Sequence, residues 1–170
     1  MARRTVPAAL EALGPDGFEG YASIFGVADG AGDRVAPGAF AASLRRRGPQ
    51  GVRMLYQHFA HEPIGVWEAM REDSRGLHVR GRLVADVERA RDVMALMREG
   101  ALGGLSIGFR TRRARRDAQT GGRTLIELDL WEISVVTFPL LDEAAVTAVG
   151  MRPEGLACAV RSAAATVRAA

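Results

Sequence analysis

The sequence contains no lysine and only one cysteine, Cys158, among its 170 residues. A single cysteine excludes an internal disulfide framework and favours a reducing compartment. The chain also lacks a run of about 18 apolar residues, and its start, Met1-Ala-Arg-Arg, is not followed by the apolar segment of a signal peptide. We therefore expect a soluble intracellular protein that does not enter a membrane.

The basic residues are all arginine, 23 of them against 20 acidic residues, so the formal net charge is only +3. We attribute the absence of lysine to the base composition of the gene rather than to chemistry. So small a charge gives little reason to expect nucleic-acid binding. With 48% apolar residues, the chain can bury one sizeable core. We expect an N-terminal arm over 1–17, one domain over 18–149 and an Ala/Arg-rich tail over 150–170.

The apolar pattern predicts more strands than helices. Strands are expected at 18–25, 52–57, 63–67, 77–83, around 105–109 and at 124–138. Short helices are expected over 37–47 and from Asp86, as the N-cap, to about Glu99, with Met94 and Met97 in the core. Short helices scattered among strands predict an α+β, β-dominated fold, with a β-barrel or sandwich surrounded by helices.

Ser106 lies in the segment Gly103-Gly-Leu-Ser-Ile-Gly-Phe109. Strand alternation puts Ser106 on one face between Gly104 and Gly108, and the apolar side chains on the other. The cleared space beside the hydroxyl indicates either a nucleophile with a docking groove or a tightly curved barrel strand. The match to the G-x-S-x-G motif of α/β-hydrolases fails, because that motif requires its histidine downstream and all three histidines here lie upstream.

His58 is the best candidate for a general base, because it stands at the end of a predicted strand. His61 follows three residues later in a predicted loop. Two histidines could hold a metal, but no cysteine or third histidine accompanies them, so we expect neither a metal nor another cofactor. A purely structural role for His58 stays open.

Glu132 is the candidate third member of a triad. Regular alternation from Ile126 to Val136 would place Glu132 in an apolar row and put Glu127 and Asp129 on the opposite face. A carboxylate in such a row needs a partner, and a histidine ring N–H is a partner whose tautomer it would fix. Pairing with a buried arginine is the alternative. A β-bulge in this span would exchange the faces and make Asp129 the rival.

The arginines over 110–116 could form a nucleic-acid patch, a solvated hairpin, or a contact for an acidic scaffold. No aromatic residue stands among them to stack on bases, so we do not expect nucleic-acid binding.

Five short motifs together resemble the prohead (capsid maturation) proteases of tailed phages, from about residue 18 to 149. They are Gly20-Tyr-Ala-Ser-Ile-Phe-Gly26, Gly32-Asp-Arg-Val35 with Pro37-Gly-Ala-Phe40, Gln57-His58 with Pro63-Ile-Gly65, Gly104-Leu-Ser-Ile-Gly-Phe109, and Leu130-Trp-Glu-Ile-Ser-Val-Val136 closed by Pro139. One departure is Leu140-Leu141, where the family often has Asn after the proline.

The resemblance implies a serine endopeptidase with a herpesvirus-assemblin-like fold, a closed or partly closed β-barrel surrounded by helices. The family's histidine and serine correspond to His58 and Ser106, and its acidic position to Glu132. The implied enzyme works in the host cytoplasm inside the immature capsid and cuts scaffold segments of the major capsid protein and itself. A terminal segment would then be removed. Whether the chain forms homo-oligomers stays open. The alternative is a non-catalytic scaffold or assembly module that keeps the fold.

Overall fold

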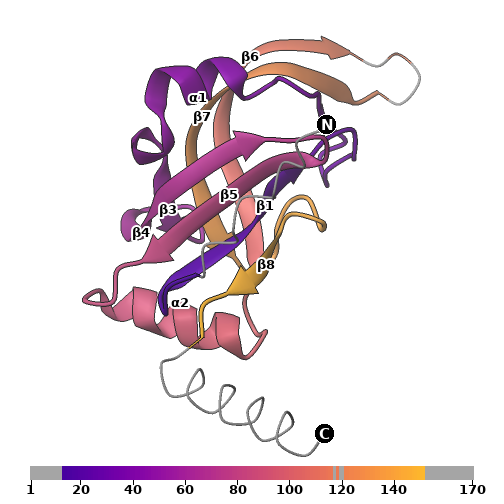
Figure 1. The fold of residues 1–170 in the computed structure, drawn as a ribbon. Helices are drawn as coiled ribbons and strands as arrows, with labels where there is room; N and C mark the ends of the chain where they lie inside the picture. Colours follow the sequence, from indigo (N-terminus) through magenta and orange to yellow (C-terminus); the bar gives the residue numbers. More distant parts are fainter. Residues whose placement is uncertain (1–12, 117, 119–120, 152–170) are drawn as a thin grey trace, which may run out of the picture.

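The computed structural model describes residues 13–116, 118 and 121–151 (Figure 1). The elements follow one another as β1 (Gly17–Ile24), β2 (Arg34–Val35), α1 (Ala41–Arg47), the 3₁₀ turn η1 (Pro49–Gly51), β3 (Arg53–Tyr56), β4 (Phe59–Glu72), β5 (Gly76–Leu83), α2 (Glu88–Arg98), β6 (Gly104–Arg116), β7 (Arg123–Val136) and β8 (Ala145–Val149). Strands dominate the described chain, as the apolar pattern predicts.

Seven of the strands close into a barrel, in the order β7-β3-β4-β5-β1-β8-β6, because β6 pairs again with β7. The junction between β6 and β8 is narrow and consists of one residue pair, Gly104 with Ala145. The short strand β2 lies parallel to β7, on the edge of β7 that also carries β3. The closed barrel with its two helices confirms the predicted α+β, strand-dominated fold class.

The core fills the barrel with the apolar face of each strand. In β5, Leu77, Val79 and Leu83 are buried whereas Arg82 is exposed, which confirms the predicted alternation. Phe18 of β1 packs edge-on against Trp67 of β4, with ring centroids 5.6 Å apart. Burying one such side chain contributes about 1.5–3 kcal/mol, so the core supplies a rigid support for the outer face.

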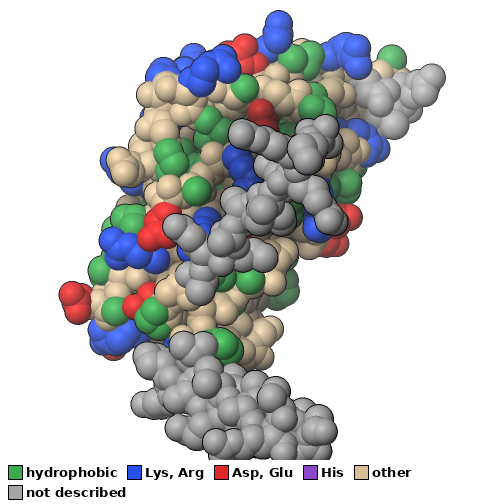
Figure 2. Space-filling view, viewed as in Figure 1, with side chains coloured by type: hydrophobic (Ala, Val, Ile, Leu, Met, Phe, Trp, Pro, Cys, Tyr) green, Lys and Arg blue, Asp and Glu red, His purple; other side chains and the backbone are tan. Residues whose placement is uncertain are grey.

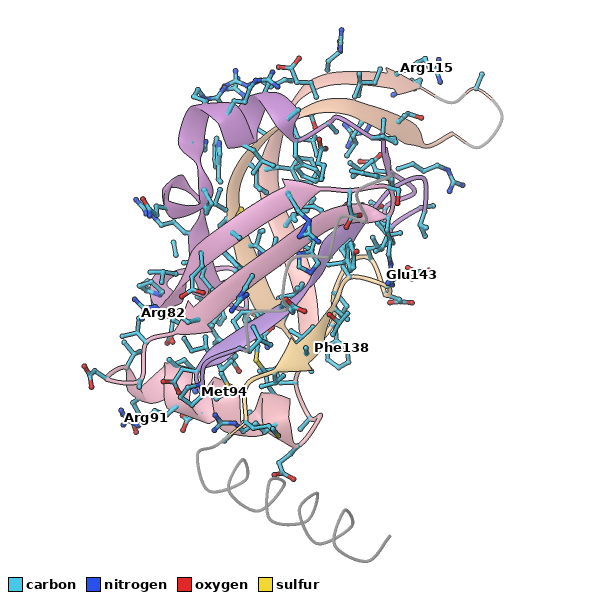
Figure 3. The ribbon with its side chains drawn as sticks, in the orientation of Figure 1. Arg82, Arg91, Met94, Arg115, Phe138 and Glu143 are labelled. Atoms are coloured by element: carbon cyan, nitrogen blue, oxygen red, sulfur yellow. The ribbon has the colours of Figure 1, made fainter. Side chains whose placement is uncertain are left out.

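The two helices lie at opposite ends of the barrel (Figure 1). Helix α1 contacts β7 and β4. Helix α2 contacts β4 and β5 and buries Met94 and Met97 as predicted. Figure 3 shows Met94 on α2, far from the β6–β7 hairpin that carries Arg115. The predicted N-cap Asp86 is wrong: α2 begins at Glu88, and Val87 occupies the cap position without a side-chain hydrogen bond.

Several predicted boundaries change. The predicted loop around His61 belongs to the long strand β4, and the arginine cluster belongs to β6 itself. Gly17, expected in the arm, begins β1 and accepts a hydrogen bond from the N–H of Gly150. The rest of the predicted arm and tail lies outside the described residues, apart from 13–16 and Met151. Among the described residues, no helix is long and apolar enough to cross a membrane.

Candidate active site

His58 sits on a tight hairpin turn between β3 and β4. Tyr56 pairs with Phe59, so Gln57 and His58 form a two-residue loop, and both have positive φ angles, 51° and 62°. Such a conformation costs roughly 1–2 kcal/mol for each residue that is not glycine. The turn must therefore be held by contacts outside itself.

Those contacts come from the end of β7. The N–H of Gln57 donates to the carbonyl of Val135 at 3.0 Å, and its side-chain amide donates to the hydroxyl of Thr137 at 2.7 Å. The N–H of His58 donates to the hydroxyl of Ser134, also at 3.0 Å. The turn is thus anchored to the strand that carries Glu132.

The ring of His58 meets Glu132 directly. Nδ1 of His58 lies 2.7 Å from Oε1 of Glu132, and the second carboxylate oxygen accepts a hydrogen bond from Ser134 at 2.7 Å. Glu132 is largely buried, while the histidine side chain is 45% exposed. With the ring proton on Nδ1, facing the carboxylate, Nε2 carries the lone pair that can accept another proton.

Ser106 lies on the strand next to this pair. It is opposite Ser134 in the β6–β7 ladder, and Gly108 is opposite Glu132. Residues opposite each other in an antiparallel pair project to the same face, with Cβ atoms about 4.5–5.5 Å apart. Ser106 therefore shares the outer face of the barrel with Ser134 and Glu132. Among the described residues, its hydroxyl makes no hydrogen bond to His58.

The predicted alternation in β7 is wrong because the strand contains a bulge. The register passes from Gly108–Glu132 to Phe109–Leu130 and skips Trp131. The buried core residues change at this point from even to odd numbers, from Leu128 and Leu130 to Ile133 and Val135. Glu132 consequently lies on the polar outer face rather than in an apolar row.

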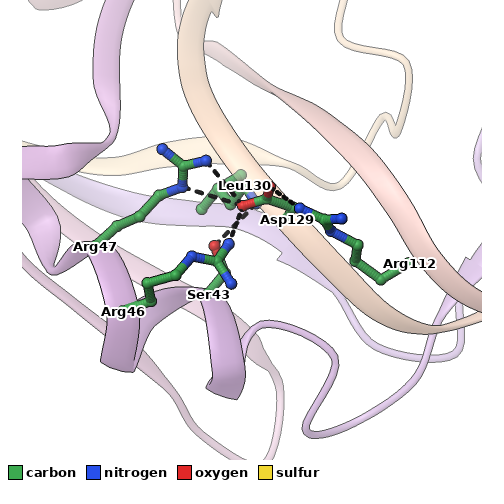
Figure 4. Close-up of polar contacts among 6 residues, drawn as sticks. All are labelled: Ser43, Arg46, Arg47, Arg112, Asp129 and Leu130. Atoms are coloured by element: carbon green, nitrogen blue, oxygen red, sulfur yellow. Dashed lines mark hydrogen bonds and ion pairs between the residues drawn. The ribbon is translucent and has the colours of Figure 1, made fainter.

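The bulge brings Glu132 to the outer side where Asp129 already lies, but Asp129 does not contact His58. Its carboxylate binds Arg46 and Arg47 of α1 and Arg112 of β6, the last at 2.8 Å (Figure 4). Burial opposes ionisation of Asp129, yet hydrogen bonds from Trp131, Arg112 and Arg47 hold its pKa well below the usual range. Asp129 thus forms ion pairs with arginines, whereas Glu132 forms a hydrogen bond with His58.

The arginines extend beyond that cluster. Over α1 they form the blue surface at the upper left of Figure 2, and on β6 they continue toward the hairpin tip, where Figure 3 labels Arg115. The β6 arginines are exposed, as a solvated hairpin requires.

The space beside Ser106 on its own strand is filled, contrary to the docking groove considered above. A Cβ on Gly104 would lie 2.8 Å from a ring carbon of Pro139, and one on Gly108 would lie 2.1 Å from Oε1 of Glu132. The space beside the two glycines is occupied by Pro139 and by the side chain of Glu132. They do not leave a vacancy for a substrate.

A separate pocket does border Ser106. It lies between β1, β6 and the two loops after β1 and β7, and part of it is open to solvent. Its lining is mostly apolar and includes Ile24, Ile107 and Leu140. Asp33, which also lines it, binds Arg123 with its Oδ1 3.0 Å from the Nε of the arginine.

The other two histidines lie apart from this constellation. The ring of His61 stacks on Phe59, with centroids 5.7 Å apart. His78 lies on β5 edge-on to Tyr21, and burial lowers its pKa. Among the described residues, no group of three or more His, Cys, Asp and Glu side chains could hold a metal ion.

Ser134 is the site residue to which sequence reasoning gave no role. The signal was available, because Ser134 stands two residues from Glu132 in one strand and so shares its face. The left-handed turn at Gln57 and His58 carried no comparable signal, since neither residue is typical of such turns.

A serine, a histidine and a carboxylate are the residue types that acyl-transfer triads combine. The sequence model of the family described as Caudovirus prohead serine protease matches residues 7–155. The chain belongs to this family, which confirms the resemblance seen in the motifs.

One sequence relative agrees with this assignment, and two solved structures share the fold. The chain is 38% identical over 134 residues to the prohead protease of Enterobacteria phage HK97, covering 78% of this chain and 59% of that protein's length. Its fold is similar to the bacteriophage T4 capsid assembly protease gp21, with a TM-score of 0.56 at 15% identity over 72% of this chain and 82% of that one. It is also similar to the KSHV protease, with a TM-score of 0.54 at 12% identity over 77% and 63%.

Proposed function

We propose that this chain is a serine endopeptidase of capsid maturation in which Ser106 is the nucleophile, His58 the general base and Glu132 the group that orients His58. The observation that carries the proposal is the 2.7 Å contact between Nδ1 of His58 and Glu132, beside the strand of Ser106. This contact leaves Nε2 of His58 available for the serine proton.

The reaction is acyl transfer in two halves. Nε2 of His58 takes the hydroxyl proton as Oγ of Ser106 attacks the peptide carbonyl, and the protonated histidine then donates to the leaving amine as the C–N bond breaks. A water molecule, deprotonated by the same histidine, then attacks the acyl group; the bond to Oγ of Ser106 breaks, and the histidine returns the proton to that oxygen. Glu132 stabilises the imidazolium in both halves.

The missing hydrogen bond between Ser106 and His58 is compatible with this mechanism. Catalytic hydrogen bonds are often long without substrate and tighten in the complex. The ladder supports the approach, because Ser106 faces Ser134, whose hydroxyl contacts the backbone of His58.

The substrates we propose are the scaffold segment of the major capsid protein and the chain itself, within the immature particle. We place an apolar substrate side chain in the pocket that borders β6, the strand of Ser106. Backbone N–H groups would stabilise the oxyanion.

The test is intact mass analysis of the chain co-expressed with its capsid protein, with and without Ser106→Ala. We expect the wild type to shorten the capsid protein and to lose a terminal segment of its own, from within 1–17 or 151–170. The Ser106→Ala chain should leave both proteins at full length while particles still assemble. Normal trimming by Ser106→Ala would exclude the proposed nucleophile. The absence of trimming in the wild type would favour the non-catalytic assembly module.

A further inference from the structure

The hydroxyl of Ser134 makes two hydrogen bonds at once. It donates to Oε2 of Glu132 at 2.7 Å and accepts from the backbone N–H of His58 at 3.0 Å. The residue is 0% exposed, so water does not compete for either bond. One buried hydroxyl therefore joins the carboxylate of Glu132 to the backbone of the histidine whose ring that carboxylate binds.

Together with the bond between the ring and Glu132, these contacts form a closed cycle. Ser134 occupies Oε2, which leaves Oε1 to the Nδ1 of His58. A glutamate side chain has several rotatable bonds, and its terminal torsion is broad and weakly restricted. A second hydrogen bond to the far oxygen fixes the plane of the carboxylate and so fixes the direction in which it receives the ring proton.

The backbone bond has its own effect. His58 has a φ of 62°, a left-handed conformation that an L residue adopts only when its surroundings impose it. The bond from its N–H to Ser134 is one of the contacts that impose it. Ser134 thus constrains the imidazole of His58 from two directions, through the backbone of His58 and through the carboxylate of Glu132.

We propose that Ser134 is a positioning residue for His58. It acts by holding the carboxylate of Glu132 and the turn of His58 in a fixed position relative to each other. This inference rests on the proposed function, since it assigns a role within that same site. It predicts that loss of the hydroxyl lowers kcat more than it raises KM, because Ser134 is fully buried.

The test compares Ser134→Ala with a matched control, Ser43→Ala. Ser43 of α1 is also a buried serine, 1% exposed. Its hydroxyl accepts a hydrogen bond at 3.0 Å from the N–H of Leu130, which lies in β7 like Ser134. Both variants remove one buried bond to a backbone N–H. Only Ser134→Ala also frees Glu132, so a difference between the two reports positioning rather than general loosening.

We expect Ser134→Ala to lower kcat by about 10- to 100-fold and to leave KM nearly unchanged. Ser43→Ala should lower the melting temperature but keep kcat. In the Glu132→Gln background, Ser134→Ala should cost much less than it costs alone, because the residue acts through Glu132. If Ser134→Ala does not fold, Ser134→Cys retains the shape with a weaker hydrogen-bonding group and takes its place.

A second measurement does not need proteolysis. In chains that carry Ser106→Ala, the Nδ1–H proton of His58 should give a slowly exchanging downfield NMR signal, which Ser134→Ala weakens and Ser43→Ala keeps. An unchanged signal together with unchanged kcat in Ser134→Ala would overturn the inference, as would an equal loss of kcat in Ser43→Ala. If the wild type fails to cleave, the proposed function fails, and the NMR signal alone decides whether Ser134 positions His58.

Discussion

Gly108 and Glu132 face each other across the β6–β7 ladder so closely that no side chain fits between them. A Cβ on Gly108 would lie 2.1 Å from Oε1 of Glu132 and 2.7 Å from its Cδ. The oxygen in question is the one that receives Nδ1 of His58. Glycine at this position thus allows the carboxylate to lie flat over β6 and reach the histidine.

The first prediction is that Gly108→Ala folds but loses activity. The nearest atoms to the added methyl all belong to the side chain of Glu132, which can swing away at little cost to the fold. A displacement of about 1 Å in a catalytic group can reduce the rate by about 10²-fold. We expect kcat/KM on the capsid substrate to fall by about this factor, with a small change in melting temperature.

The matched control is Gly103→Ala, five residues earlier. A Cβ there would meet nothing within 4 Å. This variant should keep full activity. Equal activity in Gly108→Ala and Gly103→Ala would show that the position of Glu132 does not limit the reaction.

The second prediction separates the two carboxylates on the outer side of β7. Glu132→Gln should fold and lose kcat by about 10²- to 10⁴-fold, because an amide cannot stabilise the imidazolium and can hold the wrong tautomer. Asp129→Asn should keep kcat, since Asp129 binds arginines and not His58. Steady-state kinetics on both variants decide this, and a dead Asp129→Asn with a fully active Glu132→Gln would reverse the assignment.

Much of the fold could be predicted because it depends on local pattern. The alternation of Leu77, Val79 and Leu83 fixes the buried face of β5, and the spacing of Met94 and Met97 fixes that of α2. Both follow from a regular backbone. The choice of Glu132 also agrees with its contact to His58, although the reason given for it was wrong.

What could not be predicted depends on departures from regular backbone. The bulge at Trp131 changes which side chains of β7 share a face, and nothing in Leu-Asp-Leu-Trp-Glu marks its position. The left-handed turn at His58 is imposed by hydrogen bonds that its N–H groups donate to Val135 and Ser134, the latter 76 residues away in the sequence. Contacts of this range belong to the folded barrel and have no local pattern.

The third prediction concerns the two neighbouring histidines. His58→Ala should abolish cleavage without unfolding the chain, because members of a triad act as a unit. His61→Ala should have a mild effect, since its ring stacks on Phe59 and makes no contact with Glu132 among the described residues. The rate of capsid-protein cleavage is measured for both variants. An equal loss of rate in His58→Ala and His61→Ala would instead favour a site that uses both histidines.

The last prediction concerns pH and the arginine cluster at Asp129. Hydrogen bonds from Trp131, Arg112 and Arg47 lower the pKa of Asp129 in the folded chain, against the opposing effect of burial. An aspartate in the unfolded chain has a pKa of about 3.9. The folded state therefore favours the ionised form, and this stabilisation is complete above that pH and is lost as the pH falls below it.

Asp129→Asn removes this contribution and leaves the three arginines facing one another without their shared carboxylate. We expect the variant to melt well below the wild type at pH 7, and the difference in melting temperature to narrow as the pH falls from about 5 to about 2. The exposed Asp86 supplies the control, because Asp86→Asn should follow the wild type at every pH. Thermal unfolding followed by circular dichroism at several pH values measures both. A difference that stays constant over this range would mean that Asp129 is held by shape and packing rather than by its charge.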